Sequence, residues 1–146
     1  GGDASLINST EGVLYVEMAA LADDGTNKRL TINQNTTNRI GIEFNTSGQL
    51  RFTVRIAGSF AVSAVFSADI TVNNKIAFKY KSGDYSFYLN GVNIGSNTGA
   101  FAFAVGQLTE LDFSDGGNIE MFGKTKALAV WKEALTDAEL TALTTI

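Results

Sequence analysis

Alternation of apolar and polar residues is the feature that most restricts how this chain can fold. In Leu50–Ile56, LRFTVRI, every second residue is apolar, and Arg51, Thr53 and Arg55 stand between them. Successive side chains of a strand point to opposite faces, so this segment has one face for a core and one for water. NKIAFKYK at Asn74–Lys81 repeats the pattern. Because an antiparallel sheet must cover its apolar face, the pattern predicts two sheets packed face to face.

Short apolar segments separated by turn residues continue along the whole chain. There are 15 glycines and no proline, and Asn, Ser, Thr and Asp gather between the segments, which is typical of many strands joined by tight turns. The expected strands are Val13–Leu21, Arg29–Asn33, Arg39–Phe44, Gln49–Ile56, Phe60–Phe66, Asn74–Lys81, Tyr85–Asn90, Val92–Gly95, Leu108–Phe113 and Ile119–Trp131. The fold class predicted is therefore an all-β antiparallel sandwich.

Two local signals are sharper than the rest. In FYLNGVNIG, Asn90-Gly91 suits the two-residue turn of a hairpin, because both residues tolerate positive φ. In Leu135–Leu143, Thr136 can cap a helix while Glu139 reaches back to it, which predicts a short C-terminal helix. Its leucines share one face and should lie against the sandwich or close an end of its core, with Trp131 packed beneath.

Size and charge limit the function classes. With 146 residues the chain is expected to form one domain, at residues 12–146, after a linker or N-terminal extension at residues 1–11. It does not begin with methionine, so a longer protein is expected. The net charge of −4 and the lack of a basic block predict no nucleic-acid partner. No apolar run approaches the roughly 18 residues of a membrane span, so no membrane insertion is expected.

The absence of cysteine and histidine removes disulfides, thiolate chemistry and the commonest general base and metal ligand. No cofactor is expected, with calcium as the one alternative. Asp23 and Asp24 are adjacent in an oxygen-rich loop, and neighbouring carboxylates repel unless a cation neutralises them. Asp-Gly-Asn clusters are also what ordinary turns contain, so both interpretations stay open.

Outward aromatic and charged residues are the candidates for ligand binding. An exposed aromatic flanked by polar groups suits a sugar ring. The six candidates are Tyr15, Glu17, Arg51, Arg55, Tyr88 and Asn90, which would form one mixed surface if their strands share a sheet. The alternative is structural, since outward Tyr and Arg fit any half-exposed sheet.

Three segments together resemble the laminin-G-like branch of the concanavalin A-like lectin and glucanase fold. They are the hairpin YLNGVNIG, the strand FGKTKALAVW and the capped ALTDAELTAL. EGVLYVEMAALADDGTNKRLTI and NKIAFKYKSGDYSFYLNGV are also similar to domains near the ends of phage tail-fibre and other virion structural proteins. The resemblance implies a jelly roll of two antiparallel sheets with no catalytic role. It also implies a virion location.

Glucanases of this fold make Glu110–Asp115, ELDFSD, worth testing as a catalytic motif. In them a Glu-x-Asp-x-x-Glu strand supplies the nucleophile and the acid/base. Here the last position is Asp115, and Gly116-Gly117 follows, so we expect a strand that runs into a turn and no catalytic residues.

The functional expectation is adhesion of a virion to a host-surface glycan or receptor. Other virion proteins are expected partners. A homo-oligomer is also expected, because the fibre proteins that this chain resembles are commonly trimeric. The alternatives are a purely structural virion module without a ligand and a carbohydrate-binding module of a secreted enzyme.

Overall fold

In the computed structural model, which describes residues 3–146, the chain forms ten strands and one α-helix after a short 3-10 turn at Ala4–Leu6. The strands are β1 (Glu11–Ala20), β2 (Lys28–Asn35), β3 (Asn38–Phe44), β4 (Leu50–Ile56), β5 (Ser59–Phe66), β6 (Asn74–Lys81), β7 (Tyr85–Leu89), β8 (Val92–Asn97), β9 (Glu110–Asp112) and β10 (Gly123–Trp131). The helix is α1 (Asp137–Thr144). Among the residues described, no helix is both long and apolar enough to cross a bilayer.

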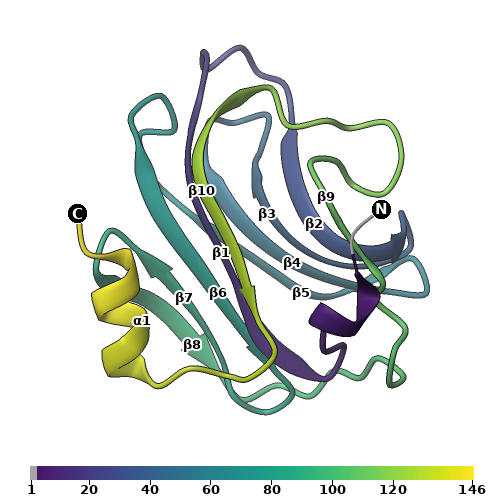
Figure 1. Cartoon of the computed structure of the whole chain (residues 1–146). Coiled ribbons are helices and arrows are strands. Elements are labelled where there is room, and N and C mark those ends of the chain that lie inside the picture. Colours follow the sequence, from purple (N-terminus) through teal and green to yellow (C-terminus); the bar gives the residue numbers. More distant parts are fainter. Residues whose placement is uncertain (1–2) are drawn as a thin grey trace.

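The strands form two five-stranded antiparallel sheets packed face to face (Figure 1). Sheet A has the order β10-β1-β6-β7-β8, and sheet B has the order β5-β4-β3-β2-β9. In each sheet one face is turned to the core, and the other is called the outer face here. The sandwich predicted from alternation is confirmed.

Every expected strand has a counterpart, but the last two are shorter than expected. Strand β9 covers only Glu110–Asp112, and β10 begins at Gly123 instead of Ile119. The amide of Met121 donates to the Phe113 carbonyl at 2.8 Å, which closes a loop between the two strands. Residues 113–122 therefore connect sheet B to sheet A and do not pair in either sheet.

Aromatic packing joins the two sheets at Phe52 of β4. Its ring stacks on Phe87 of β7 with centroids 4.6 Å apart, and meets Phe78 of β6 edge-on at 5.6 Å. Phe66 of β5 adds an edge contact to Phe52 at 5.9 Å. Such offset and edge-to-face pairs add to the free energy of burying the rings. The core is therefore centred between β4 and the β6–β7 pair.

Helix α1 lies on the outer face of sheet A, beside β6 and β7 (Figure 1). Its capping box forms as predicted, because Thr136 Oγ1 accepts from the Glu139 amide and the Glu139 carboxylate accepts from the Thr136 amide. The helix covers a face of the sandwich and not an end of its core. Beneath it lies a second apolar cluster, formed by Val13, Tyr15, Ala77, Tyr88 and Leu140, against which Trp131 packs as expected.

The β7–β8 hairpin turns at Asn90-Gly91, with positive φ at both residues, as predicted. The side chain of Asn90 has a second task. Its Oδ1 accepts from the Lys75 amide and its Nδ2 donates to Asn74 Oδ1, each at 2.9 Å. Asn90 therefore ties the hairpin to the start of β6.

The residues before β1 lie against the sandwich. The Tyr80 hydroxyl donates to the Asn8 carbonyl at 3.0 Å, and the Leu108 amide donates to the buried Ser9 hydroxyl at 2.9 Å. The domain boundary expected at residue 12 stays a prediction, and residues 1–2 of the expected linker lie outside the described residues.

Leu140 should be the residue that fastens α1 to sheet A, because its side chain is fully buried. We expect Leu140→Ala to lower the free energy of unfolding by about 2–4 kcal/mol, through lost burial and the cavity left behind. Urea denaturation followed by circular dichroism measures this. Thr141→Ala, at an exposed neighbour, is the matched control and should change stability little. Equal effects of both substitutions would contradict the proposed role of Leu140.

Candidate functional site

The six candidate residues do not form the single surface that the sequence suggested. Tyr15, Glu17 and Tyr88 belong to strands of sheet A, whereas Arg51 and Arg55 belong to sheet B. The outer faces of the two sheets lie on opposite sides of the sandwich. A single binding surface required the strands of all six candidates to share one sheet, and they do not.

The two tyrosines point away from the main core, as expected, but α1 covers them. Tyr88 is only 1% exposed and Tyr15 is 7% exposed. Burial raises the pKa of the Tyr88 hydroxyl, and a hydrogen bond with Asp137 raises it further. Tyr15 meets Trp131 edge-on, with centroids 6.3 Å apart. The expectation that these tyrosines are exposed is therefore wrong, because a helix fills the space above them.

The two polar candidates of this group have structural partners. Glu17 Oε1 accepts from Asn73 Nδ2 at 2.6 Å and lies 3.7 Å from the Lys126 ammonium group. The amide of Asn90 bonds to β6, as described above. Glu17 and Asn90 are therefore engaged within the chain.

The loop at Asp23 and Asp24 has an internal cation. Asp24 Oδ1 lies 2.6 Å from Nζ of Lys28, whose side chain is almost fully buried. Hydrogen bonds from Lys28 and then from Thr26 lower the pKa of Asp24 well below its usual range. Within residues 3–146, no three acidic, histidine or cysteine side chains gather as a metal site would require. Calcium was considered because the adjacent carboxylates need a neutralising cation, and the ammonium group of Lys28 supplies that positive charge at Asp24.

The outer face of sheet B carries three rows of side chains that run across the strands. Strand register places Arg29, Glu43, Arg51 and Val65 in one row. The middle row is Thr31, Gly41, Thr53 and Ser63, and the third is Asn33, Arg39, Arg55 and Phe60. A central row of small residues thus lies between two rows that hold four arginines.

Glu43 neutralises the first row. Its Oε2 lies 2.5 Å from Nε of Arg29, and its Oε1 lies 2.6 Å from Nε of Arg51. The second contact is an ion pair in which the N–H is not aligned as a hydrogen bond. Because Glu43 is almost fully buried, its charge is costly unless both arginines stay in place.

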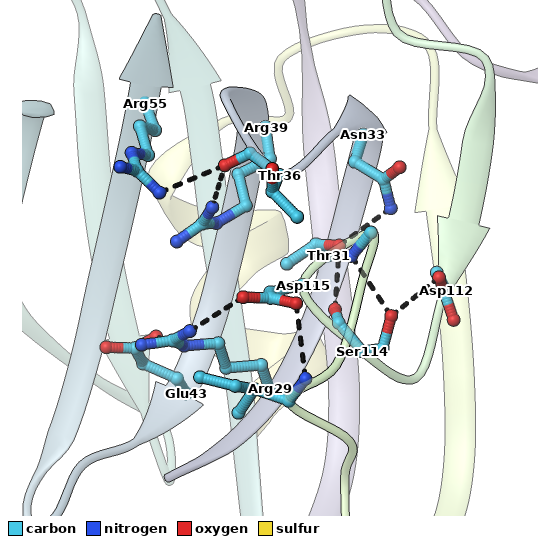
Figure 2. A network of polar contacts seen from close by, with 12 residues as sticks. Arg29, Thr31, Asn33, Thr36, Arg39, Glu43, Arg55, Asp112, Ser114 and Asp115 are labelled. Carbon is cyan, nitrogen blue, oxygen red and sulfur yellow. Dashed lines mark hydrogen bonds and ion pairs between the residues drawn. The ribbon is translucent and has the colours of Figure 1, made fainter. Parts of the chain in front are cut away.

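The third row has no such neutralisation. Arg39 and Arg55 each donate from Nη1 to the Thr36 carbonyl, at 3.1 Å for Arg55 (Figure 2). Neither forms an ion pair with a carboxylate within the described residues. Burial, followed by the positive charges of Arg29 and Arg55, lowers the pKa of the Arg39 guanidinium. Two guanidinium groups therefore meet at the Thr36 carbonyl, and Arg55 also donates from Nε to the Gly58 carbonyl at 2.9 Å, so all of these acceptors are neutral.

Buried polar atoms beside this point also lack partners. They are Nε of Arg39 and Oγ1 of Thr53, and Oδ1 of Asn33, opposite Arg39, is a third; none has a hydrogen-bond partner in the part of the chain that the structure describes. Buried polar groups in folded proteins are nearly always satisfied, so exceptions need an explanation such as a ligand.

Phe60 ends the third row with an exposed aromatic ring. It is 46% exposed, and the guanidinium carbons of Arg51 and Arg55 lie 4.9 Å and 5.4 Å from its ring centroid. This cation–π packing holds both arginines near the ring. Arg51, Arg55 and Phe60 thus combine an apolar platform with positive charge on an accessible surface.

The ELDFSD segment folds as predicted, as a strand that enters a turn. Strand β9 ends at Asp112, and Gly116 has φ +79°. Unexpectedly, the turn folds over the outer face of sheet B. Asp115 Oδ2 accepts from Arg29 Nη1 at 2.8 Å, and the Ser114 carbonyl accepts from Thr31 Oγ1 at 2.9 Å (Figure 2). Asp115 is therefore an acidic neighbour of the arginine rows.

Sequence reasoning found Arg51 and Arg55 but missed Arg29, Arg39 and Phe60. Arg29 and Arg39 could have been found, because Arg29 alternates with apolar residues along β2 and Arg39 does so along β3. The outward position of Phe60 could not be predicted from alternation. The pairing of β4 with β5 shifts between Val54 and Arg55, and this shift changes which residues of β5 face outward.

Glu43 should hold the arginine rows together. We expect Glu43→Gln to lower the free energy of unfolding by about 3 kcal/mol, because two largely buried guanidinium groups would lose their shared counter-ion. Glu110→Gln removes the same charge from an exposed position of β9 and is the control. Chemical denaturation of both variants gives the comparison, and a stability loss that is no larger for Glu43→Gln would refute the role assigned to Glu43.

The loop at Asp24 should not respond to calcium. Because a ligand that binds only the folded state raises its stability, a calcium site would show as a higher melting temperature. We expect millimolar calcium chloride to leave the melting temperature unchanged relative to the same ionic strength of sodium chloride. A calcium-specific rise that Asp23→Asn abolishes would overturn this expectation.

Comparison with known proteins gives close structural matches at low sequence identity. The CBM40 of the Ruminococcus gnavus IT-sialidase, bound to α2,3-sialyllactose, superposes with a TM-score of 0.74 at 20% identity over 94% of this chain and 83% of that chain. The leech intramolecular trans-sialidase gives a TM-score of 0.72 at 20% identity, over 94% of this chain but 24% of the enzyme. The NanB sialidase from Streptococcus pneumoniae gives 0.66 at 18% identity, over 99% and 26%. At these identities the likeness establishes the fold alone.

No curated protein matches the sequence. A family model described as the concanavalin A-like lectin/glucanases superfamily matches residues 15–141. The match covers most of the sandwich and part of α1. This chain belongs to the concanavalin A-like lectin/glucanases superfamily.

Proposed function

We propose that this chain is a non-catalytic carbohydrate-binding module that binds an acidic glycan on the outer face of sheet B. The observation that carries the proposal is the convergence of Arg39 and Arg55 on the Thr36 carbonyl with no carboxylate partner. A carboxylate oxygen would accept from the same donors and would supply the missing charge.

The surroundings of this point suit a sugar. The exposed ring of Phe60 offers an apolar surface for the face of a pyranose, and Arg51 and Arg55 flank it. Thr53 Oγ1 adds an unpartnered polar atom in the neighbouring row. Arg51 and Arg55, two of the residues expected from sequence, thus stay candidates, and Tyr88 does not.

The structural relatives support a sialylated ligand. The R. gnavus CBM40 was seen with α2,3-sialyllactose and with α2,6-sialyllactose, and both sugars carry a carboxylate. Because the relatives belong to sialidases, they favour the alternative of an enzyme's carbohydrate-binding module over the virion adhesin. The virion location and its protein partners stay predictions on which the relatives do not bear.

Isothermal titration with α2,3-sialyllactose, α2,6-sialyllactose and lactose tests the proposal. The wild-type protein should bind the sialylated sugars and not lactose, which lacks the carboxylate. Arg55→Ala should weaken binding about 10- to 100-fold, because a charge-assisted hydrogen bond contributes about 1.5–3 kcal/mol.

Lys126→Ala is the matched control, since it removes an exposed cation from β10 of sheet A. It should leave affinity unchanged. Equal losses in both variants would point to non-specific attraction, and absence of binding to a broad glycan array would favour a purely structural module.

A further inference from the structure

The loop that follows β9 covers the arginine site. An added Cβ would lie 2.6 Å from Thr36 Cγ2 at Gly117 and 2.8 Å from the Asn35 carbonyl carbon at Gly116, so the loop backbone packs closely against the β2–β3 turn that carries the Thr36 carbonyl. Arg39 is only 1% exposed in this arrangement. A ligand on the surface can reach Arg55 and Phe60, but it cannot reach Arg39 unless residues 113–118 move.

Asp115 is the residue of this loop that faces the arginines. Its carboxylate bonds to Arg29 at 2.8 Å, and its negative charge also acts on the guanidinium of Arg39 (Figure 2). Asp115 is 7% exposed. A carboxylate of the chain itself therefore lies beside the place proposed for the carboxylate of the ligand.

The loop is held by polar bonds and has little apolar anchorage. Ser114 Oγ donates to Asp112 and accepts from the Gly116 amide, while its carbonyl accepts from Thr31. The aromatic residues at its two ends, Phe113 and Phe122, are 45% and 60% exposed. Segments with few buried apolar contacts open at low free-energy cost, and two successive glycines favour that opening.

We propose that Asp115 is an internal competitor of the ligand: in the free protein it is bonded to Arg29 beside the arginine site, and it moves away, with residues 113–118, when an acidic sugar binds. The proposal rests on the function proposed above, because Asp115 lies beside Arg39, one of the two arginines that would hold the sugar carboxylate. It makes Asp115 a residue that sets both affinity and specificity. When Asp115 moves away, a neutral sugar cannot replace its negative charge beside the arginines, whereas the carboxylate of an acidic sugar can.

Asp115→Asn tests this competition, because the amide keeps the shape of the side chain and an oxygen for the Ile119 amide but loses the charge. Apparent affinity falls in proportion to the fraction of molecules in which the site is open. We expect Asp115→Asn to bind α2,3-sialyllactose about tenfold more tightly than wild type. Glu110→Gln, with the same change in net charge at an exposed position of β9, should stay within about twofold.

Ser114→Ala loosens the loop through different atoms and keeps Asp115 and the arginines unchanged. It should also tighten binding, by about two- to threefold, since it favours the open loop. Thermal melts confirm that each variant is folded. Affinity that is equal to or weaker than wild type in folded Asp115→Asn, while wild type binds, overturns the inference and leaves the proposed function intact.

A second measurement separates the two proposals if no protein binds sialyllactose. The Nε–Hε signals of Arg39 and Arg55 in nitrogen-15 spectra can be titrated with sodium acetate, against sodium chloride at equal ionic strength. If Asp115 competes with carboxylates, these signals should saturate at several-fold lower acetate in Asp115→Asn than in wild type. Identical titrations overturn the inference, whereas a clear difference supports it even where the glycan itself fails to bind.

Discussion

The stacking of Phe52 on Phe87 is the contact on which the rest of the molecule depends. It joins β4 of sheet B to β7 of sheet A at 4.6 Å between ring centroids. Because side chains alternate along a strand, burying Phe52 forces Arg51 and Thr53 to the opposite face. A register slip of one residue would exchange the two sets. The positions of the arginines are thus a direct result of how the core packs.

The two outer faces differ because their residues differ. The outer face of sheet A carries the apolar cluster of Val13, Ala77 and the two tyrosines, which requires a cover, and α1 provides it. The outer face of sheet B carries four arginines that bond to carboxylates and carbonyls and need no apolar cover. The C-terminal helix thereby covers the outer face of sheet A, and the outer face of sheet B is left to polar contacts.

Local features of the fold could be predicted from sequence, and long-range ones could not. The strands, the Asn90-Gly91 turn and the Thr136 cap each depend on neighbouring residues, and the structure confirms them. The orientation of Tyr88 was also predicted, but its burial was not, because nothing near it in sequence tells where α1 docks. The Arg29–Asp115 bond joins residues 86 positions apart. The sequence of a turn rich in Asp and Gly does not indicate which part of the sandwich the turn packs against.

The place of β10 at the edge of sheet A has a consequence for how copies of this module behave when crowded. An edge strand presents unpaired backbone N–H and C=O groups that can form hydrogen bonds with a strand of another molecule, and charged side chains discourage such pairing. Lys124 and Lys126 are exposed on this strand. Repulsion between the lysines of two approaching edges opposes intermolecular sheet formation. Copies of this domain can therefore lie close together without pairing at this edge.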